Sequence, residues 1–301
     1  MGHFSISDLE QLSGIKAHTI RMWEQRYDLL KPVRTATNIR MYSEDDLRRL
    51  LNVTTLCARG QRISQVARLS DAEISQAVLA CCDDAHDYHL QVNTLLAAML
   101  GFDEPRLSQL LSEASQRLGF ERMMLAVAYP LLQRIGLMWL AGTVDMAQEH
   151  MLAHLLRQKI LAATDVLPAV PTTARRWVLF LPADELHELA LLFMNYLLRV
   201  RGHHTLYLGQ NLPLVGLVNV EASYHPDAIV AVLTSQPERG RVADYARELQ
   251  VLFPQAQLVL YGPLARQEGL ELPANCVSPV LMTDFLDLVA ALQPRSEPVA
   301  A

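Results

Sequence analysis

The sequence is poor in cysteine and has no hydrophobic run long enough to cross a membrane. Its 301 residues include four cysteines, Cys57, Cys81, Cys82 and Cys276, whose spacing fits neither a zinc-binding pattern nor a disulfide framework. No apolar stretch reaches the roughly 18 to 20 residues that a membrane helix needs. The first residues, MGHFSISD, lack the basic and apolar regions of a signal peptide. These absences predict a cytoplasmic protein whose cysteines are reduced.

The chain as a whole also lacks the excess of positive charge that is usual in proteins that bind nucleic acids. Its net charge is −6. The charge is uneven, however, because residues 1–70 contain 11 Lys and Arg against 7 Asp and Glu, a net +4, which leaves −10 for the remainder. A basic head on an acidic body predicts that any phosphate contacts are made near the N-terminus. The length and the 51% of hydrophobic residues allow two or three domains with sizeable cores.

Apolar residues at helical spacing characterise the first 75 residues. Ile6, Leu9 and Leu12 follow this spacing, and Gly14 then interrupts it. Two short helices around a Gly-containing turn form a helix-turn-helix, and the polar segment that follows suits a hairpin wing. The expected elements are helices over 5–13 and 17–27, a wing over 31–42, and helices over 45–59 and 63–69, the third of which opens at the acidic cap Ser43-Glu44-Asp45-Asp46.

The rest of the chain divides into two further patterns. From 83 to 168, apolar residues recur every three or four positions, which predicts a four-helix bundle. From 174 to 293, five short β-rich runs alternate with helical stretches, which predicts a doubly wound, parallel, five-stranded Rossmann-like sheet of the flavodoxin-like type. We therefore expect a multidomain α plus α/β protein with domains at 1–75, 83–168 and 174–293.

Basic and polar side chains on the second helix and the wing are candidates for holding DNA. The second helix of a helix-turn-helix enters the major groove, where an arginine such as Arg21 can fork to guanine or to phosphate. Wing residues suit contacts to the DNA backbone. The candidates are Lys16, His18, Thr19, Arg21, Met22 and Arg26 on the helix, and Arg34, Thr35, Asn38, Arg40 and Tyr42 on the wing. The alternative is a small helical domain with an ordinary charged face. For Trp23 and Tyr27 there is a competing role as core aromatics.

The segment HTIRMWEQRYDLLKPVR, followed by NIRMYSEDDLRRL, resembles the MerR-type winged helix-turn-helix. The family pattern is Thr-hydrophobic-Arg-x-aromatic-Glu, then L-x-P-x-R, then R-x-Y and D-L. The matching residues are Thr19, Arg21, Trp23, Glu24, Leu30, Pro32, Arg34, Arg40, Tyr42, Asp46 and Leu47. The resemblance implies sequence-specific binding to double-stranded DNA at a palindromic promoter element. It also implies a homo-oligomer, dimer or tetramer, with RNA polymerase as a further partner.

The bundle and the α/β segment together resemble the cobalamin-binding half of CarH- and LitR-type regulators and of methionine synthase. In that family a Trp-x9-Glu-His motif covers the upper face of the corrin, and Trp139, Glu149 and His150 match it in type and spacing. The indole would lie over the ligand around its upper axial group, and the carboxylate would accept hydrogen bonds from an adenosyl ribose. The alternative is a helix with a buried tryptophan and a surface Glu-His pair.

A second family motif, D/E-x-H-x-x-G, follows the first strand, and its histidine is an axial ligand of cobalt. Glu185 and His187 match it, but Ala190 replaces the glycine. A carboxylate partner for a metal-bound imidazole is sensible chemistry, at the strand ends where such sheets bind ligands. Two further family positions depart from the pattern. Ser235 lies in a stretch, VLTSQ, that aligns poorly with the family Ser-x-Leu or Ser-x-Thr, and the family Gly-Gly is Gly262-Pro263 here.

Light-sensing members carry a histidine directly after the motif tryptophan, where this chain has Leu140. We therefore expect a non-enzymatic transcription regulator with a cobalamin-type sensor and oligomerisation module, binding adenosylcobalamin or methylcobalamin, that does not act as a bis-histidine light sensor. One alternative is a regulator whose degenerate cobalamin domain serves only for oligomerisation or docking. A more remote alternative is an enzyme of the cobalamin-dependent methyltransferase class.

Overall fold

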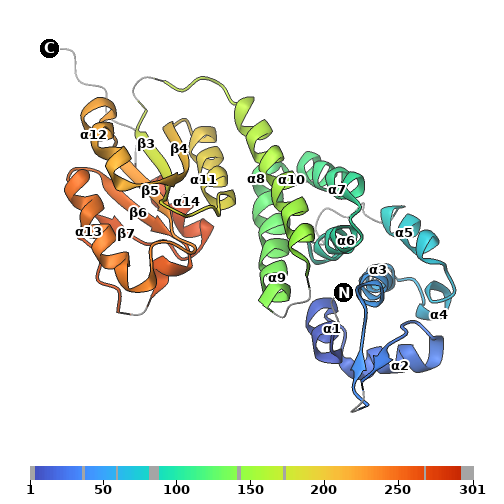
Figure 1. Ribbon diagram of the computed structural model, residues 1–301. Coiled ribbons are helices and arrows are strands. Elements are labelled where there is room, and N and C mark those ends of the chain that lie inside the picture. Colours follow the sequence, from blue (N-terminus) through green and yellow to red (C-terminus); the bar gives the residue numbers. More distant parts are fainter. Residues whose placement is uncertain are drawn as a thin grey trace. The chain divides into compact units, whose positions relative to one another are not determined.

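The computed structural model describes residues 4–35, 38–58, 60–80, 88–140, 144–171, 174–267 and 269–292. The chain splits into two compact units, Met1–Leu155 and Leu156–Ala301. The first contains the head and most of the helical segment, and the second contains the sheet (Figure 1). Within the described ranges, no helix is both long enough and apolar enough to span a membrane.

The head is the predicted winged helix-turn-helix. Helix α1 (Ile6–Ser13) begins with a capping box, in which Ser5 and Asp8 bond reciprocally. It ends at Gly14, whose φ of 74° lies in the left-handed region that glycine adopts without strain. Helix α2 (Ala17–Tyr27) follows. Strands β1 (Val33–Arg34) and β2 (Arg40–Met41) then pair antiparallel to form the wing.

Helix α3 (Glu44–Ala58) is buried along most of its length and packs against α1 on one side and helix α6 (Tyr88–Leu100) on the other. The head and the first bundle helix thus share one helix as core. Two short helices, α4 (Ile63–Val66) and α5 (Asp71–Ala80), come between α3 and α6. The sequence patterns did not predict α5.

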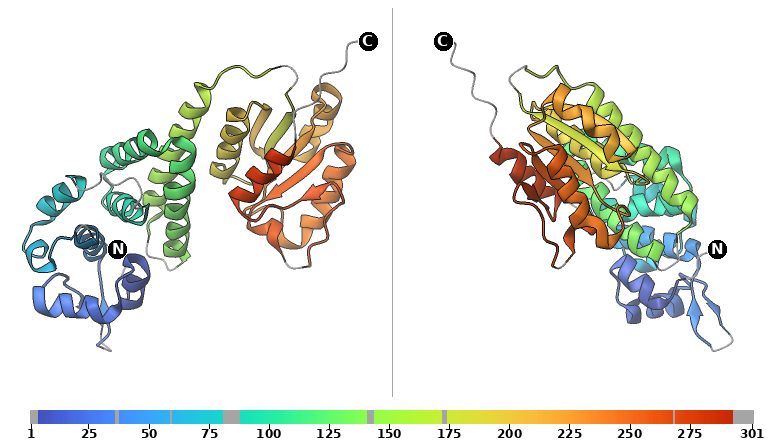
Figure 2. Two further views of the ribbon diagram at one scale, coloured as in Figure 1. Left: turned by 180° about the vertical axis from the view of Figure 1, so that it is seen from behind. Right: turned by 60° about the vertical axis from the view of Figure 1, so that its left-hand side comes forward.

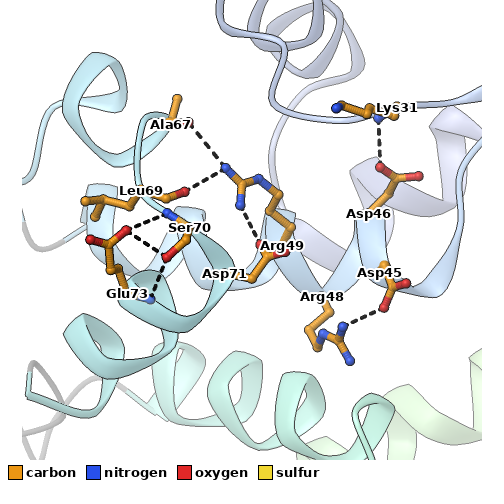
Figure 3. A network of polar contacts seen from close by, with 10 residues as sticks. All are labelled: Lys31, Asp45, Asp46, Arg48, Arg49, Ala67, Leu69, Ser70, Asp71 and Glu73. Atoms are coloured by element: carbon orange, nitrogen blue, oxygen red, sulfur yellow. Dashed lines mark hydrogen bonds and ion pairs between the residues drawn. The ribbon is translucent and has the colours of Figure 1, made fainter.

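The turn between α4 and α5 is held by Arg49 of α3 (Figure 3). Its guanidinium donates to the carbonyls of Ala67, at 3.3 Å, and Leu69, at 3.1 Å, and pairs with Asp71. The fourth helix ends at Val66 and not at the predicted residue 69, because the N–H groups of Arg68 and Leu69 donate to carbonyls three residues earlier instead of four.

The predicted four-helix bundle is present. After α6 come α7 (Glu104–Leu118), a long helical segment and α10 (Met146–Asp165). The long segment consists of α8 (Phe120–Met123), the π-helical turn η1 (Met124–Ala128) and α9 (Tyr129–Leu140). The N–H of Tyr129 donates to the Met124 carbonyl five residues earlier, and Pro130, which has no N–H to donate, follows directly.

The second unit is the predicted parallel five-stranded sheet, with the order β4-β3-β5-β6-β7 that is typical of flavodoxin-like folds. Its strands are β3 (Arg176–Pro182), β4 (His204–Leu212), β5 (Ala228–Val232), β6 (Gln257–Tyr261) and β7 (Cys276–Val277). The main helices are α11 (Leu189–Val200), α12 (Val218–Tyr224), α13 (Val242–Leu252) and α14 (Met282–Ala291).

Helices cover both faces of this sheet (Figure 2). The alternation of β3 side chains places different residues against each face. Val178 and Phe180 belong to the buried cluster that includes Phe253 at the end of α13. Trp177 points to the other face, where its ring meets that of Phe285 of α14 at 6.2 Å between centres. The carboxyl ends of the parallel strands are therefore left for loops, the usual ligand edge of such folds.

Candidate functional sites

Helix α2 presents one face to the surface and buries the other. The exposed face, at three- and four-residue spacing, consists of His18, Arg21, Met22 and Gln25. Ile20 and Trp23 are buried on the opposite face, so the core role considered for Trp23 is confirmed. Gln25 was missed among the DNA-binding candidates, although the spacing of the other three residues would have included it.

Three other candidates of the helix lie beside this face. Lys16 precedes the helix, and its Nζ lies 3.0 Å from Glu10 Oε1 in an ion pair. Arg26 is exposed, with its guanidinium 5.8 Å from the centre of the Tyr27 ring. Thr19 is only half-buried. DNA contact by these three residues stays a prediction, and Lys16 would have to exchange Glu10 for a phosphate.

On the wing, Arg34 and Asn38 are exposed and bonded to each other. The Arg34 Nη1 donates to Asn38 Oδ1 at 2.6 Å. Asn38 has a φ of 63°, a left-handed conformation that asparagine tolerates better than most residues. The Thr35 N–H donates to the Ile39 carbonyl at 2.9 Å, and the Ile39 N–H donates back to Thr35 Oγ1 at 3.1 Å. The described part of the wing thus presents a cationic and an amide group at its surface, bonded to each other.

Arg40 and Tyr42, expected to contact the DNA backbone, both bond to Glu24, and Tyr42 supports the head from inside. Tyr42 is 0% exposed, and its hydroxyl donates to Glu24 Oε2 at 3.0 Å. Burial, with the bond to Glu24, raises the pKa of Tyr42 well above its usual range. Arg40 Nε donates to the other oxygen of Glu24, also at 3.0 Å. The expectation for Tyr42 is wrong, because its buried side chain is not available to DNA. Arg40 pairs with the same carboxylate but keeps 24% of its side chain exposed, so its contact with DNA stays a prediction.

The second candidate site lies just after β3, at the carboxyl edge of the sheet. His187 Nδ1 lies 2.5 Å from Glu185 Oε1, and the His187 side chain is 60% exposed while that of Glu185 is 0% exposed. When a carboxylate holds Nδ1, it favours the tautomer in which the proton is on Nδ1 and Nε2 is the coordinating atom. The geometry therefore suits His187 to metal coordination from an exposed loop.

Glu185 also closes the neighbouring loop after β5. Its Oε2 accepts the N–H groups of Thr234, Ser235 and Gln236 at 3.0, 2.6 and 3.1 Å, and the Ser235 hydroxyl at 3.1 Å. Burial by itself would raise the pKa of Glu185. The hydrogen bonds from His187 and from this loop outweigh it, so the pKa lies well below the usual range. Ser235, a candidate cofactor-binding residue, thus has its hydroxyl directed to Glu185.

Gly262, another cofactor-binding candidate, has a structural reason to be glycine. Its φ is 117°, and a Cβ at this position would lie 2.5 Å from the backbone oxygen of Leu233. The loops after β5 and β6 approach each other closely here, since the Leu264 N–H donates to the same oxygen at 3.2 Å. The glycine permits this approach, and a cofactor role for it stays a prediction.

The remaining candidates lie at the end of α9 and the start of α10, in the first unit. Trp139 is in the last turn of α9, and its side chain and that of Leu140 are outside what the structure describes. Glu149 is half-buried and His150 is exposed. The His150 ring meets that of His154, one turn further on, edge to face at 6.0 Å between centres.

A winged helix-turn-helix ahead of a helical bundle and a flavodoxin-like sheet defines a MerR-type regulator with a cobalamin-binding module. Residues 4–73 match the MerR HTH family regulatory protein model, and residues 91–163 match the B12 binding domain model. The chain belongs to the family of MerR-type transcription regulators that includes CarH of Myxococcus xanthus. It is 31% identical to this HTH-type transcriptional repressor over 270 residues, which cover 87% of this chain and 89% of the relative.

Two further likenesses agree with this assignment. The HTH-type transcriptional repressor CarA of the same organism is 24% identical over 277 residues, or 88% of each chain. The structure of a monomethylamine corrinoid protein from Methanosarcina barkeri has a TM-score of 0.53 at 12% identity. It covers 66% of this chain and 96% of that one. At this identity the likeness concerns the fold alone. The chain is thus a DNA-binding transcription regulator with a cobalamin-binding module.

Proposed function

We propose that this chain is a cytoplasmic regulator whose DNA binding is controlled by cobalamin. The form of cobalamin that it binds is adenosylcobalamin or methylcobalamin. The observation that carries the proposal is the Glu185–His187 pair, with an exposed imidazole held through Nδ1 at the carboxyl edge of the sheet. We assign His187 as the lower axial ligand of cobalt and Glu185 as the group that orients it. Bound cobalamin would supply a cobalt–carbon bond whose presence distinguishes two states of the sensor.

We assign the upper face of the corrin to Trp139, Glu149 and His150, following the family motif. Their support is that Glu149 and His150 are adjacent residues near the start of α10, neither of them buried. The half-buried carboxylate of Glu149 is suited to accept hydrogen bonds from a ribose hydroxyl.

We propose that the DNA target is a palindromic promoter element bound by a homodimer or homotetramer. At this promoter the protein would also contact RNA polymerase. A palindrome places two recognition helices on equivalent half-sites. The exposed face of α2 supplies the groups for base edges, and Arg34 with Asn38 supplies the wing contact to the backbone.

Replacement of His187 by alanine tests the axial ligand. After incubation with adenosylcobalamin and desalting, we expect wild-type protein to retain the corrinoid with the absorption bands of imidazole-coordinated cobalt. His187→Ala should shift these bands toward those of the form without imidazole. His204→Ala, which removes a histidine from the first residue of β4, is the matched control and should leave them unchanged. Retention with an unaltered spectrum in His187→Ala would reject the assignment.

Illumination is expected not to dissociate the protein as it would a bis-histidine sensor. That switch needs a bundle histidine to capture cobalt once the cobalt–carbon bond breaks, and Leu140 cannot coordinate a metal. Size-exclusion chromatography of protein with adenosylcobalamin, in the dark and after illumination, measures this. A light-driven fall to monomer with bis-histidine absorption would contradict the prediction and direct attention to His150 and His154.

A second candidate function is a regulator that works without ligand and uses the α/β unit for oligomerisation or docking. The observation in its favour is that Ser235 and the loop after β5 are directed to Glu185, so the carboxylate has a structural task of its own. The desalted spectrum separates the two functions, because this candidate predicts no retained corrinoid. An enzymatic function of the methyltransferase class is supported only by a likeness of fold. We propose that the chain has no enzymatic function.

A further inference from the structure

Gln148 joins three helix ends inside the first unit. It lies in the first turn of α10, and its side chain is 0% exposed. Its Nε2 donates to the Leu100 carbonyl at the end of α6, at 3.2 Å, and to Glu44 Oε2 at the start of α3, at 3.1 Å. Its Oε1 accepts the Asp145 N–H at 3.0 Å, directly before α10. One buried amide therefore ties the start of α10 to the head.

The groups that Gln148 contacts belong to helix ends, which have backbone atoms without partners in their own helix. The Leu100 carbonyl and the Asp145 N–H are such atoms, and the amide serves both. A buried amide with both ends bonded is held in one position, because leaving a buried donor or acceptor without a partner costs free energy. Any displacement of the first turn of α10 must therefore move Glu44 or break these bonds.

Glu44 begins the helix that positions the wing. Two residues further on, Asp46 Oδ2 accepts the N–H and the hydroxyl of Ser43, both at 2.9 Å. Asp46 Oδ1 accepts the N–H of Lys31 at 2.8 Å (Figure 3). Lys31 lies between the recognition helix α2 and the strand β1. The first turn of α3 is thus bonded to Gln148 on one side and to the base of the wing on the other.

We propose that Gln148 is a positioning residue that transmits movement of the start of α10 to the DNA-reading head. It precedes Glu149 and His150, the residues assigned to the upper face of the corrin. In this respect the inference rests on the proposed function. A ligand that shifts these two residues shifts the Gln148 amide, and through Glu44 and Asp46 it changes the position of the wing. The coupling is carried by named hydrogen bonds between rigid helices.

The mechanical link is tested without ligand, by hydrogen exchange of the full-length protein. Gln148→Leu keeps a side chain of similar size but removes all three bonds. We expect amides of the first turn of α3 and of the wing, Lys31 above all, to exchange about tenfold faster or more. Peptides from 174–292 should be unchanged. Gln158→Leu makes the same replacement at an exposed position of α10 and should alter neither region.

Two further variants separate the link from a general loss of packing. Gln148→Glu keeps the acceptor for Asp145 and loses both donors, so it should speed exchange in the head as Gln148→Leu does. Glu44→Ala breaks the same link from the other side. Combining it with Gln148→Leu should add little to the larger single effect, because both variants lack the bond between Gln148 and Glu44. Head amides that exchange at wild-type rates in folded Gln148→Leu and Gln148→Glu, or fully additive effects, would overturn the proposal.

Adenosylcobalamin then tests the coupling itself. We expect it to change exchange in the wing of the wild type and to leave the wing of Gln148→Leu unchanged, although that variant retains the corrinoid spectrum. An equal response of both wings overturns the transmission. A wild-type protein that retains no corrinoid contradicts the proposed function instead, and the comparison without ligand still decides the mechanical link.

Discussion

Replacing Arg21 by alanine should weaken specific DNA binding by about 1 to 3 kcal/mol, or roughly five- to 150-fold, while the head stays folded. Arg21 lies on the exposed face of α2, away from the buried Ile20 and Trp23, so its removal opens no cavity. Its guanidinium is the group on this face that can bond a guanine edge or a phosphate with two donors. The measurement is a gel-shift titration with a duplex that the wild-type protein selects from a random-sequence pool.

Two variants complete the Arg21 experiment. Arg247→Ala removes the same charge from an exposed position of α13, in the second unit, and should bind DNA as the wild type does. Arg21→Lys keeps the charge but loses the forked donors, so it should restore affinity if the contact is to phosphate and fail to restore specificity if it is to guanine. Unchanged affinity of correctly folded Arg21→Ala would remove Arg21 from the DNA interface.

Replacing Glu185 by alanine should destabilise the second unit by about 3 kcal/mol or more at pH 7, because several donors to a buried carboxylate lose their acceptor at once. The N–H groups of Thr234, Ser235 and Gln236 are the main ones. The loss in the free energy of unfolding is measured by urea unfolding, monitored through the hydrogen exchange of peptides from 174–292. Glu248→Ala, at an exposed position of α13, is the control and should change the stability little.

The Glu185 effect has a defined pH dependence. The pKa of this carboxyl is lower in the folded protein than the ordinary value of 4.5 expected for the unfolded chain. Below that value the unfolded chain therefore binds more protons than the folded protein, and stability falls as the pH falls. The difference between wild type and Glu185→Ala should be full above about pH 5 and shrink progressively as the pH falls below 4.5 toward the lower pKa of the folded protein. A difference that is small at pH 7, or independent of pH, would contradict the proposed role of the carboxylate.

The sequence predicted the architecture well because each part has its own period. The bounds of α2 agree with the predicted helix over 17–27 residue for residue, and the five β-rich runs form the five strands of the sheet. The departures lie where long-range contacts take over. Helix α4 is shorter than its pattern, and the turn after it is held by Arg49 of α3 through the carbonyls of Ala67 and Leu69. Helix α5 has a weak apolar pattern and was missed.

Sequence motifs were less reliable for the task of individual polar residues. Arg40 and Tyr42 match the family pattern, and the motif alone could not show that both converge on Glu24, 16 and 18 residues earlier. The motif gave Glu185 and His187 as a pair, but not the bonds from Glu185 to the loop after β5, some 50 residues later. Gln148 has no motif at all, and its role depends on the three helix ends that meet around it.

The amino-acid sequence by itself determined the class of most elements, the order of the modules, the basic head and the residues available for chemistry. These properties depend on local spacing and composition, which a chain carries before it folds. The tertiary structure alone decided which polar groups bond to one another within the chain and which stay exposed to a partner. The physical reason is that a buried carboxylate or amide without a hydrogen-bond partner costs free energy. The partners come from distant segments that only the packed chain brings together.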